Sequence, residues 1–290
     1  MFEDSILITA LASGSGPRVP VVAGCVFGIL LLAGVLIDLY WLRTRKHAGL
    51  NVRWMNRRMI NRAWPLRGFL GLLLLLAACH VLGWMVTVAA GRWGGGLSEP
   101  AAVLVQSVCF HGAGLLLIGL YMVRSGRGLQ ECFGMGPVRP DKVFLRGLRY
   151  YLAAMPLIWA GGLAYQFLLR AAGTPVNLQP VVHIIRAAEH PGWMAYFILL
   201  AVVVGPLFEE LFFRGIAFPA AARYLGVPWA IAAVSAAFAL LHMHGPTLVP
   251  LFLVSAAFCL GYWRTGSLWV SIVMHACFNG VNLVLLLGSG

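Results

Sequence analysis

The stretch GFLGLLLLLAACHVLGWMVTVAA, residues 68–90, decides the fold class. It holds no Asp, Glu, Lys or Arg, and about 20 apolar residues of helix are enough to cross the core of a bilayer. Comparable apolar runs recur along the chain, at 19–42, 101–123, 148–170, 193–214, 228–242, 248–263 and 268–287. The run 228–242 is short and can be tilted or re-entrant. We therefore predict an all-α, polytopic membrane helical bundle of about eight transmembrane helices, with seven as the alternative count.

The composition of the 290-residue chain agrees with a membrane protein. Hydrophobic residues make up 61% of the chain and charged residues 10%, whereas a soluble domain carries about 25% charged residues. Soluble enzymes and disordered chains are excluded on these grounds. The formal charge of +12 does not indicate a nucleic-acid-binding protein, because basic residues in so apolar a chain gather in loops on the cytoplasmic side of a bilayer.

Two loops contain 14 of the 21 Lys and Arg residues and fix the predicted orientation. Residues 43–67 hold eight basic side chains and no acid, and residues 124–149 hold six beside two acids. Both loops are predicted to be cytoplasmic, so eight crossings put both termini outside. We expect an integral, multi-pass membrane protein, located in the plasma membrane if its source is bacterial.

The segment 43–67 also interleaves aromatic and apolar side chains with its arginines, namely Trp54, Met55, Met59, Ile60 and Trp64. This mixture is typical of a helix that lies in the membrane interface beside anionic lipid. The partner expected for this segment is the lipid bilayer, and no nucleic acid is expected to bind.

Ionisable side chains inside the predicted spans are costly and therefore candidates for function. Between His190 and Gly290 the only acids are the adjacent Glu209 and Glu210. The N-terminal spans contribute three further ionisable residues, for which packing or a hydrogen bond to a neighbouring helix is the simpler role; these are Asp38, His80 and His111.

In the motif GPLFEELFFRG, residues 205–215, the two adjacent acids point in different directions from the helix. Glu210 and Arg214 are four residues apart, so they share one helix face and can pair. Glu209 points about 100° away from that pair. A simple interfacial ion pair explains Glu210 and Arg214, but it leaves the second buried carboxylate unexplained.

The motif SAAFALLHMHG, residues 235–245, ends an apolar helix. Phe238 and His242 share a face of that helix, because they are four residues apart. His244 lies beside Gly245 in the following turn and is expected to be an interfacial residue only.

The motif IVMHACFNG, residues 272–280, places His275 and Asn279 on one face in mid-span. Such a pair can merely join two helices by hydrogen bonds. Together, however, the three motifs put a carboxylate base, two imidazoles and an amide on three helices of one bundle. This combination suits water activation and stabilisation of an oxyanion.

In this order along the last four hydrophobic segments, the motifs EExxxR, FxxxH and HxxxN resemble the CPBP family, which comprises CAAX-prenyl endopeptidases and bacteriocin-processing and bacteriocin-immunity proteins and is also called the ABI family. The resemblance rests on Glu209, Glu210, Arg214, Phe238, His242, His275 and Asn279. It covers about 193–287, and residues 1–140 add nothing to it. On this resemblance 147–290 are expected to form the catalytic region of one integrated membrane domain, to which 1–146 add N-terminal helices with basic cytoplasmic loops.

The resemblance implies a glutamate-dependent intramembrane endopeptidase. Its substrate would be a peptide or a protein, with a prenylated CAAX protein and a bacteriocin-type peptide as the two options. The catalytic roles would fall on Glu209 as general base, His242 as the residue that holds and polarises the water, and His275 and Asn279 as donors to the oxyanion. The supporting roles would fall on Glu210, Arg214 and Phe238.

Zinc is the cofactor to weigh against this mechanism. Members of the family are often labelled metalloproteases, and Glu209, His242 and His275 are residue types that bind zinc. The chain contains no HExxH motif, however, and the three ligands would have to come from three separate helices. The prediction is therefore a mechanism without metal or other cofactor, with zinc as the alternative.

His242 is predicted to lie at a different depth in the membrane from Glu209 and His275. With strictly alternating spans, Glu209 and His275 lie near the cytoplasmic ends of their helices, whereas His242 lies about 20 Å deeper at 1.5 Å per residue. The three side chains can share one polar cavity, within about 10 Å of one another, only if 215–242 departs from a simple crossing. We predict a bend in this segment, at one or more of Pro219, Gly226 and Pro228.

Two other classes of function remain open. One is a non-proteolytic binding or immunity protein on the same scaffold, and the other is a transporter or proton relay. A transporter would favour an inverted internal repeat, which the chain does not show, and a purely structural scaffold would not require Glu209. The protease is therefore the leading interpretation.

Overall fold

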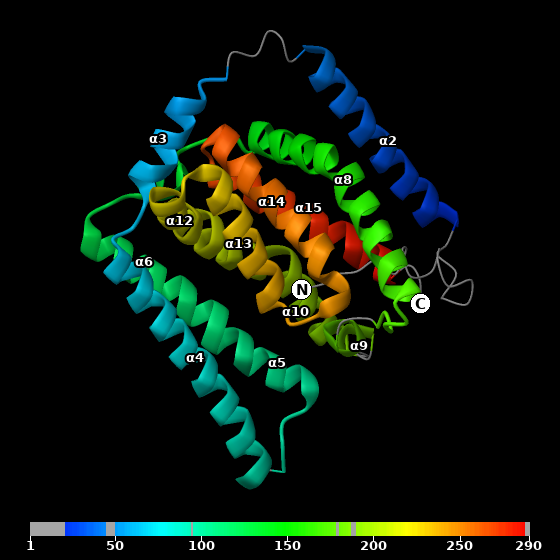
Figure 1. The fold of residues 1–290 in the computed structure, drawn as a ribbon. Helices are drawn as coiled ribbons and strands as arrows, with labels where there is room; N and C mark the ends of the chain where they lie inside the picture. Colours follow the sequence, from blue (N-terminus) through cyan, green and yellow to red (C-terminus); the bar gives the residue numbers. More distant parts are fainter. Residues whose placement is uncertain (1–20, 45–49, 94, 178–179, 187–189, 288–290) are drawn as a thin grey trace.

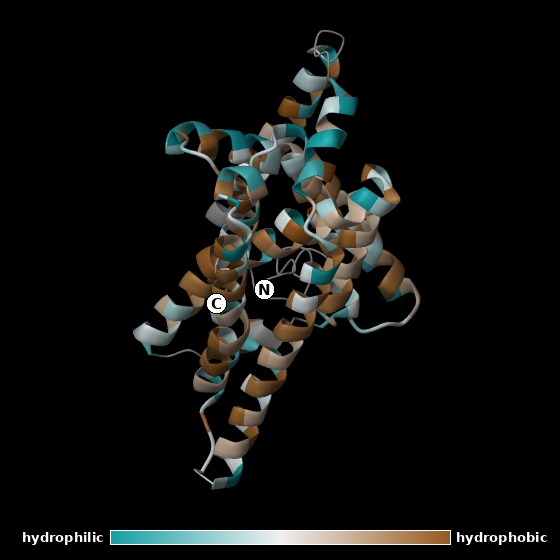
Figure 2. Cartoon of the chain, turned by 90° about the vertical axis from the view of Figure 1, so that its left-hand side faces the viewer, coloured by the Kyte–Doolittle hydropathy of each residue, from teal (hydrophilic) through white to brown (hydrophobic). Residues whose placement is uncertain are grey.

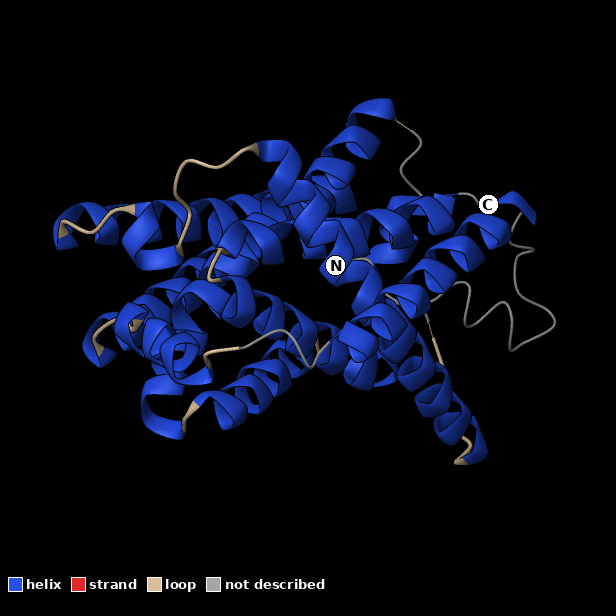
Figure 3. Cartoon of the chain, turned by 90° about the horizontal axis from the view of Figure 1, so that it is seen from above, coloured by secondary structure: helices blue, strands red, loops and turns tan. Residues whose placement is uncertain are grey.

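The computed structural model describes residues 21–44, 50–93, 95–177, 180–186 and 190–287, and within these ranges every regular element is a helix (Figure 1). Seen from above, only helices and their connecting loops appear in the described part of the chain (Figure 3). The elements are α2 (Val21–Thr44), α3 (Val52–Arg62), α4 (Leu66–Trp93), α5 (Glu99–Ser107), η2 (Val108–Gly112), α6 (Ala113–Ser125), α7 (Leu129–Phe133), α8 (Pro140–Ala171), α9 (Pro180–Arg186), α10 (Pro191–Leu199), η3 (Leu200–Val204), α11 (Gly205–Glu209), η4 (Glu210–Ala217), α12 (Phe218–Leu225), α13 (Val227–Leu241), η5 (Gly245–Thr247), α14 (Leu248–Thr265) and α15 (Leu268–Leu287).

Seven helical segments of the described chain are long and apolar enough to cross a membrane, which confirms an all-α, polytopic, multi-pass membrane protein. They are Gly24–Thr44, Leu66–Trp93, Glu99–Ser125, Pro140–Ala171, Pro191–Leu225, Gly245–Thr265 and Leu268–Leu287. The eighth predicted span corresponds to the shorter apolar helix α13. The expected count of about eight is therefore met by seven long helices and one short one.

The long helices differ in how much protein surrounds them. In α2, α4, α5–α6 and α8 only 11–28% of the apolar window is buried, whereas in the last three long segments the share is 50–56%. Apolar residues run along the length of the long helices, and hydrophilic residues gather toward their ends (Figure 2). The C-terminal half is thus the packed centre of the bundle, and the N-terminal helices present most of their apolar surface outward.

Helix α8 connects the centre of the bundle with the N-terminal helix α2. It packs against α14 and α15 on one side and against α2 on the other, while α13 packs against both α12 and α14. Helices α4, α5 and α6 pack mainly on one another and form a separate arm beside this centre (Figure 1). The C-terminal motifs therefore lie in the part of the bundle where side chains are best shielded.

Helix α3 is present where an interfacial helix is expected, but one of its faces is buried against protein. Met55 and Met59 are buried, and Trp54 and Ile60 are exposed. The helix packs against α12 and α14. The expectation of a helix partnered only by lipid is therefore wrong for the buried face, because its methionines find apolar protein surface instead.

Two arginines of α3 bind the end of α14. Arg58 donates to the carbonyl oxygens of Trp263 and Thr265, and Arg62 donates to the carbonyl oxygen of Gly266 at 2.8 Å. The last carbonyl groups of a helix have no partner within the helix and need donors from elsewhere. These guanidinium groups supply them, so α3 connects the N-terminal half to the C-terminal half of the chain.

The predicted departure of 215–242 from a simple crossing occurs at Gly226. This residue has φ of +76° and ψ of 160°, and it separates α12 from α13. A residue with a Cβ would be strained at this positive φ. Pro228 produces no separate break, because it lies in the first turn of α13, where the missing N–H costs little. Pro219 lies within the continuous helical segment Pro191–Leu225, directly after the π-helical stretch η4.

Helix α8 approaches its neighbours closely at a glycine. A Cβ placed on Gly147 would lie 2.5 Å from the Cβ and Cγ1 atoms of Val273 on α15. Real side chains do not approach this closely, so only glycine allows this contact. The packing of α8 on α15 therefore depends on the absence of a side chain at this position.

Gly147→Ala is expected to lower the free energy of unfolding by about 1–3 kcal/mol, because the added methyl group forces the two helices apart. The measurement is the unfolding temperature of the purified protein in detergent. Gly119→Ala is the matched control, because no atom lies within 4 Å of a Cβ at that exposed position of α6. Equal unfolding temperatures of the two variants would contradict the close packing of α8 on α15.

Candidate functional site

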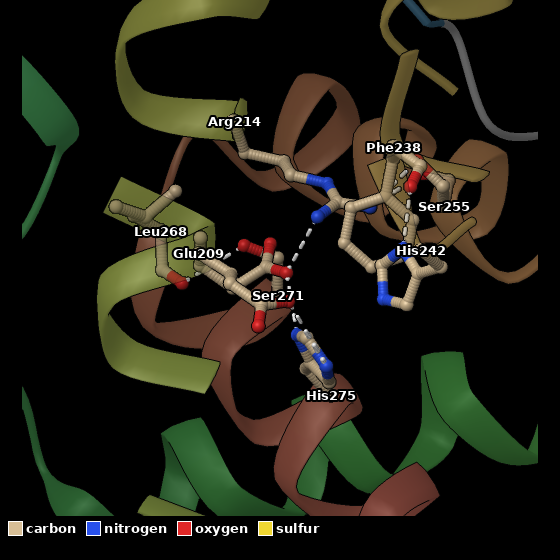
Figure 4. A network of polar contacts seen from close by, with 9 residues as sticks. Glu209, Arg214, Phe238, His242, Ser255, Leu268, Ser271 and His275 are labelled. Atoms are coloured by element: carbon tan, nitrogen blue, oxygen red, sulfur yellow. Dashed lines mark hydrogen bonds and ion pairs between the residues drawn. The ribbon is translucent and has the colours of Figure 1, made fainter. Parts of the chain in front are cut away.

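The candidate site is built from four elements of the C-terminal half, α11, η4, α13 and α15. Glu209 ends α11, and Glu210 begins η4, a wider π-helical stretch that also carries Arg214. Helix α13 carries the FxxxH motif, and α15 carries the HxxxN motif. Figure 4 shows Glu209 and Arg214 together with Phe238 of α13, His242 directly after α13 and His275 of α15.

Arg214 and Glu210 form the ion pair predicted from their spacing. Arg214 Nη1 donates to Glu210 Oε1 at 2.8 Å, and both side chains are 0% exposed. Arg214 Nη2 donates to the hydroxyl and the carbonyl oxygen of Ser255 on α14, at 2.8 and 3.2 Å. The guanidinium is therefore oriented from two helices at once.

Aromatic rings enclose the guanidinium of Arg214. Its Cζ atom lies 4.6 Å from the ring centroid of Phe238 and 5.0 Å from that of Phe258. Arginine stacks favourably on aromatic faces when water is excluded. Phe238, expected to have a supporting role, thus contacts the cation of the buried ion pair.

His275 lies between the two carboxylates. Its Nδ1 donates to Glu210 Oε1 at 2.9 Å, and its Nε2 lies 3.9 Å from Glu209 Oε2. Figure 4 shows the carboxylates between Arg214 on one side and His275 on the other. The structure therefore brings together Glu209, Glu210, Arg214 and His275 in one shielded cluster.

Glu209 differs from Glu210 in its partners. Its side chain is buried, and among the described residues its Oε2 atom, like Glu210 Oε2, has no hydrogen-bond partner. Glu210, however, is bonded through Oε1 to both Arg214 and His275, at 2.8 and 2.9 Å. Most buried polar atoms are hydrogen-bonded, so an exception requires an explanation. A carboxylate oxygen that is shielded and unpartnered beside an imidazole is suited to accept a proton from a reactant.

The Phe238 ring lies near both His242 and His275. The ring centroids are 4.7 Å apart for Phe238 and His242 and 6.1 Å apart for Phe238 and His275. His242 Nδ1 contacts the Phe238 carbonyl oxygen, and because a carbonyl only accepts, Nδ1 carries the proton. The neutral ring then presents Nε2 as an acceptor.

His244 does not join this cluster. Its Nδ1 lies 3.2 Å from the Thr247 hydroxyl, and partial burial lowers the pKa of the His244 imidazole below its ordinary value. The residue stays in the turn between α13 and η5, as its sequence context indicates.

Asn279 donates to a backbone carbonyl on a neighbouring helix. Its Nδ2 atom lies 2.8 Å from the carbonyl oxygen of Ala201 in η3. In η3 the N–H of Gly205 bonds to the carbonyl of Leu200, and the next residue, Pro206, has no N–H. The Ala201 carbonyl therefore lacks a backbone donor at both helical positions, and the Asn279 amide replaces it.

Three of these contacts involve residues that the motifs do not reveal. Ser255, Phe258 and Ala201 orient or enclose site residues, as described above. Ser255 carries the only sequence signal, since it is a hydroxyl within an apolar run of α14. The Ala201 carbonyl becomes visible only after the π-helical geometry before Pro206 is known.

The N-terminal histidines remain outside the cluster. His111 packs edge-on against Phe208, with ring centroids 5.2 Å apart. His80 Nδ1 lies 3.5 Å from Gln106 Nε2. Both arrangements agree with packing and interhelical hydrogen bonding, the roles expected for residues of this kind.

The three residues considered for zinc do not form a metal site as they are arranged. The Nδ1 atoms of His275 and His242 are bonded to Glu210 and to the Phe238 carbonyl, so only their Nε2 atoms could face a metal ion. Within the described ranges, no group of three or more His, Cys, Asp or Glu side chains is positioned to hold a metal ion. The geometry of Glu209, His242 and His275 thus does not fit the tetrahedral set that zinc prefers.

Comparison with known proteins adds one finding. Residues 191–281 match a family model described as Rce1-like, type II CAAX prenyl endopeptidase. No curated protein and no solved structure matches the chain. The matched region contains all seven residues of the three motifs and every element that contributes to the candidate site.

Asn279→Ala is expected to lower the free energy of unfolding by about 1–3 kcal/mol, because it leaves the Ala201 carbonyl buried without a donor. Pro206→Ala supplies a backbone N–H close to that carbonyl. The double variant P206A/N279A should therefore regain most of the lost stability, measured as the unfolding temperature in detergent.

The single variant P206A is the control for this experiment, because replacing proline alone changes the unfolded chain as well. A double-mutant cycle then isolates the coupling between positions 206 and 279. Strictly additive effects of the two substitutions would show that Asn279 does not compensate for the proline.

Proposed function

We propose that the chain is an intramembrane endopeptidase in which Glu209 activates the attacking water, since residues 191–281 match the family model of Rce1-like, type II CAAX prenyl endopeptidases. The observation that carries this proposal is the shielded Oε2 atom of Glu209, which has no partner in the described chain and lies 3.9 Å from His275 Nε2. Glu210 also has an unpartnered Oε2, but its Oε1 is bonded to Arg214 and His275, as expected of a structural carboxylate.

Charge balance favours an imidazolium at His275. Arg214 neutralises Glu210, so a second carboxylate at Glu209 would leave one uncompensated negative charge in an apolar environment, which is costly. A protonated His275 makes the four groups neutral together. Its Nδ1–H then donates to Glu210, and its Nε2–H faces the reaction space beside Glu209.

The reaction follows from these positions. A water molecule donates one hydrogen bond to Glu209 and a second to His242 Nε2, and its oxygen attacks the carbonyl carbon of the scissile bond. Glu209 accepts the proton that the water loses. When the C–N bond breaks, Glu209 returns this proton to the leaving amine, so that a carboxylic acid and an amine are released and the base is regenerated.

The negative charge that develops on the carbonyl oxygen is stabilised by donors. His275 Nε2–H is one, and Asn279 is the other, because its Nδ2 has two hydrogens and the contact with Ala201 uses only one. Donors that are already oriented cost no reorganisation at the moment of reaction. Arg214, Glu210 and Ser255 keep His275 in place and do not contact the substrate.

The substrate of a protease of this family is a protein, and we propose that here it is a membrane-anchored one with a prenylated CAAX end. The reacting groups lie on helices within the membrane-spanning half of the chain. A prenyl group partitions into the bilayer and brings the adjacent peptide bond to this depth. A bacteriocin-type peptide is the second substrate to test, because it can enter the same bundle without a lipid.

Glu209→Gln is expected to be produced in normal amounts and to lose cleavage, because an amide cannot accept the proton from water. The matched control is Glu210→Gln, which makes the same chemical change one residue away. It removes the partner of Arg214, and breaking a buried ion pair costs about 3–5 kcal/mol, so its yield should fall.

Both variants are measured as purified full-length proteins in lipid vesicles with a farnesylated CAAX peptide, with the products identified by mass spectrometry. The yield and the monodisperse fraction report on folding. Cleavage by Glu209→Gln at the wild-type rate would exclude Glu209 as the base.

Exhaustive chelation is expected to leave cleavage unchanged, and elemental analysis should find no stoichiometric zinc. Asn279→Ala should lower turnover by about 10²–10³-fold, the usual effect of losing one oxyanion donor. This measurement is best made in the Pro206→Ala background, where the stability of the two proteins is similar. Stoichiometric zinc together with chelator-sensitive cleavage would favour a metal mechanism while leaving the protease assignment intact.

A further inference from the structure

A second site lies away from the catalytic cluster, where the end of α2, the start of α8 and the end of α14 meet. Residues of all three helices line a pocket of about 1050 Å³. In Figure 1 these helices are labelled at the upper side of the molecule. None of the seven motif residues lines this pocket.

The pocket is strongly basic. Its lining includes Lys142, Arg146 and Arg149 of α8 and Arg264 of α14, against the single carboxylate of Asp38. The three α8 residues are spaced i, i+4 and i+7, so they share one helix face. In the part of the chain that the structure describes, none of the four cations has a carboxylate within 4 Å.

Four cations around one cavity repel one another unless an anion joins them. The two buried arginines, by contrast, have partners, since Arg214 binds Glu210 and Arg62 binds the Gly266 carbonyl. The pocket therefore presents charge that the described protein does not compensate. A ligand with at least one phosphate group would supply the missing charge and accept several hydrogen bonds.

Aromatic side chains cross-link the three helices around the pocket. The rings of Trp41 on α2 and Tyr150 on α8 have centroids 5.2 Å apart. The guanidinium of Arg264 lies 5.9 Å from the Trp41 ring centroid. Trp and Tyr occur preferentially at the level of lipid head groups, and the pocket therefore has the composition of a head-group site.

The rim of the pocket is apolar as well as basic. Leu42 and Leu145 line it and are 57% and 62% exposed. Further along α2, the helix that carries Leu42, the residues Leu36 and Leu39 are 57% and 56% exposed. A soluble phosphate has no apolar group that could cover this surface, whereas the acyl chains of a phospholipid can bury it.

We propose that this pocket binds the head group of an anionic glycerophospholipid, with the phosphate among Arg146, Arg149 and Arg264 and the acyl chains along α2. The basic loops beside it mark the predicted cytoplasmic side, where anionic lipids attract Lys and Arg. Only 11% of the apolar window of α2 is buried in protein. The lipid would join α2 to α8 and α14, and it would stabilise the arrangement of all three helices.

The experiment compares lipid binding of the full-length protein with that of R146Q/R149Q. Native mass spectrometry in detergent counts bound phosphatidylglycerol and phosphatidylcholine, and the unfolding temperature is measured with each lipid. Each basic residue near an anionic surface contributes about 1 kcal/mol, so the double variant should bind phosphatidylglycerol about 30-fold more weakly. The rise in unfolding temperature that phosphatidylglycerol produces by binding the folded state should be lost with it.

The matched control is R124Q/R223Q, which removes the same charge from exposed positions of α6 and α12 outside the pocket. It should bind phosphatidylglycerol like the wild type. If R146Q/R149Q unfolds too readily to be measured, the single variants R146Q and R149Q provide the same comparison with smaller expected changes.

Three results would overturn the proposal. One is equal binding of phosphatidylglycerol by R146Q/R149Q and the control, and another is equal binding of phosphatidylcholine and phosphatidylglycerol by the wild type. The third is an increase in unfolding temperature with inorganic phosphate alone that matches the increase with the lipid, since this would assign the pocket to a soluble phosphate. None of these measurements uses proteolytic activity, so the result is independent of the proposed catalytic function.

Discussion

The ion pair between Arg214 and Glu210 is the interaction on which the rest of the catalytic half depends. Both side chains are 0% exposed, so losing one partner leaves a charge without solvent or counter-ion. Ser255 orients the guanidinium, and Glu210 in turn orients His275 through its Nδ1 atom. Since His275 Nε2 faces Glu209, the position of the proposed base relative to its imidazole is set by a pair that does no chemistry itself.

A second constraint comes from the backbone. Inside a membrane protein, N–H and C=O groups must find partners within the protein. The π-helical turn before Pro206 leaves the Ala201 carbonyl without a backbone donor, and Asn279 donates to it. The carbonyl groups at the end of α14 also lack helical donors, and Arg58 and Arg62 donate to them. In the proposed mechanism Asn279 would serve both folding and catalysis, because one hydrogen of its amide satisfies the Ala201 carbonyl and the other would donate to the oxyanion.

Much of this arrangement could be predicted from the sequence, for identifiable reasons. The apolar runs determine the spans because the bilayer sets their length, and the i,i+4 spacing determines the contact of Glu210 with Arg214 because it lies within one helix. The contacts of Ser255 and Ala201 could not be predicted, because they depend on how separate helices are placed. The docking of α3 was missed for the same reason: its arginines and methionines suit a lipid surface and a protein surface equally well, and only the position of the α14 end distinguishes the two.

The arginines of this chain are distinguished by what compensates their charge. Arg214 is compensated by a carboxylate and aromatic rings, and Arg58 and Arg62 by carbonyl oxygens at a helix end. In the basic pocket, by contrast, the lining contains four cations and one carboxylate, that of Asp38. In the described chain this carboxylate forms no ion pair with any of the four. A positive charge left uncompensated on the protein side must be balanced from the surroundings, and at the end of a membrane-spanning helix those surroundings are lipid head groups. In the proposed catalytic cluster the positive and negative side chains balance one another, whereas in the basic pocket an anionic ligand would have to supply the missing negative charge.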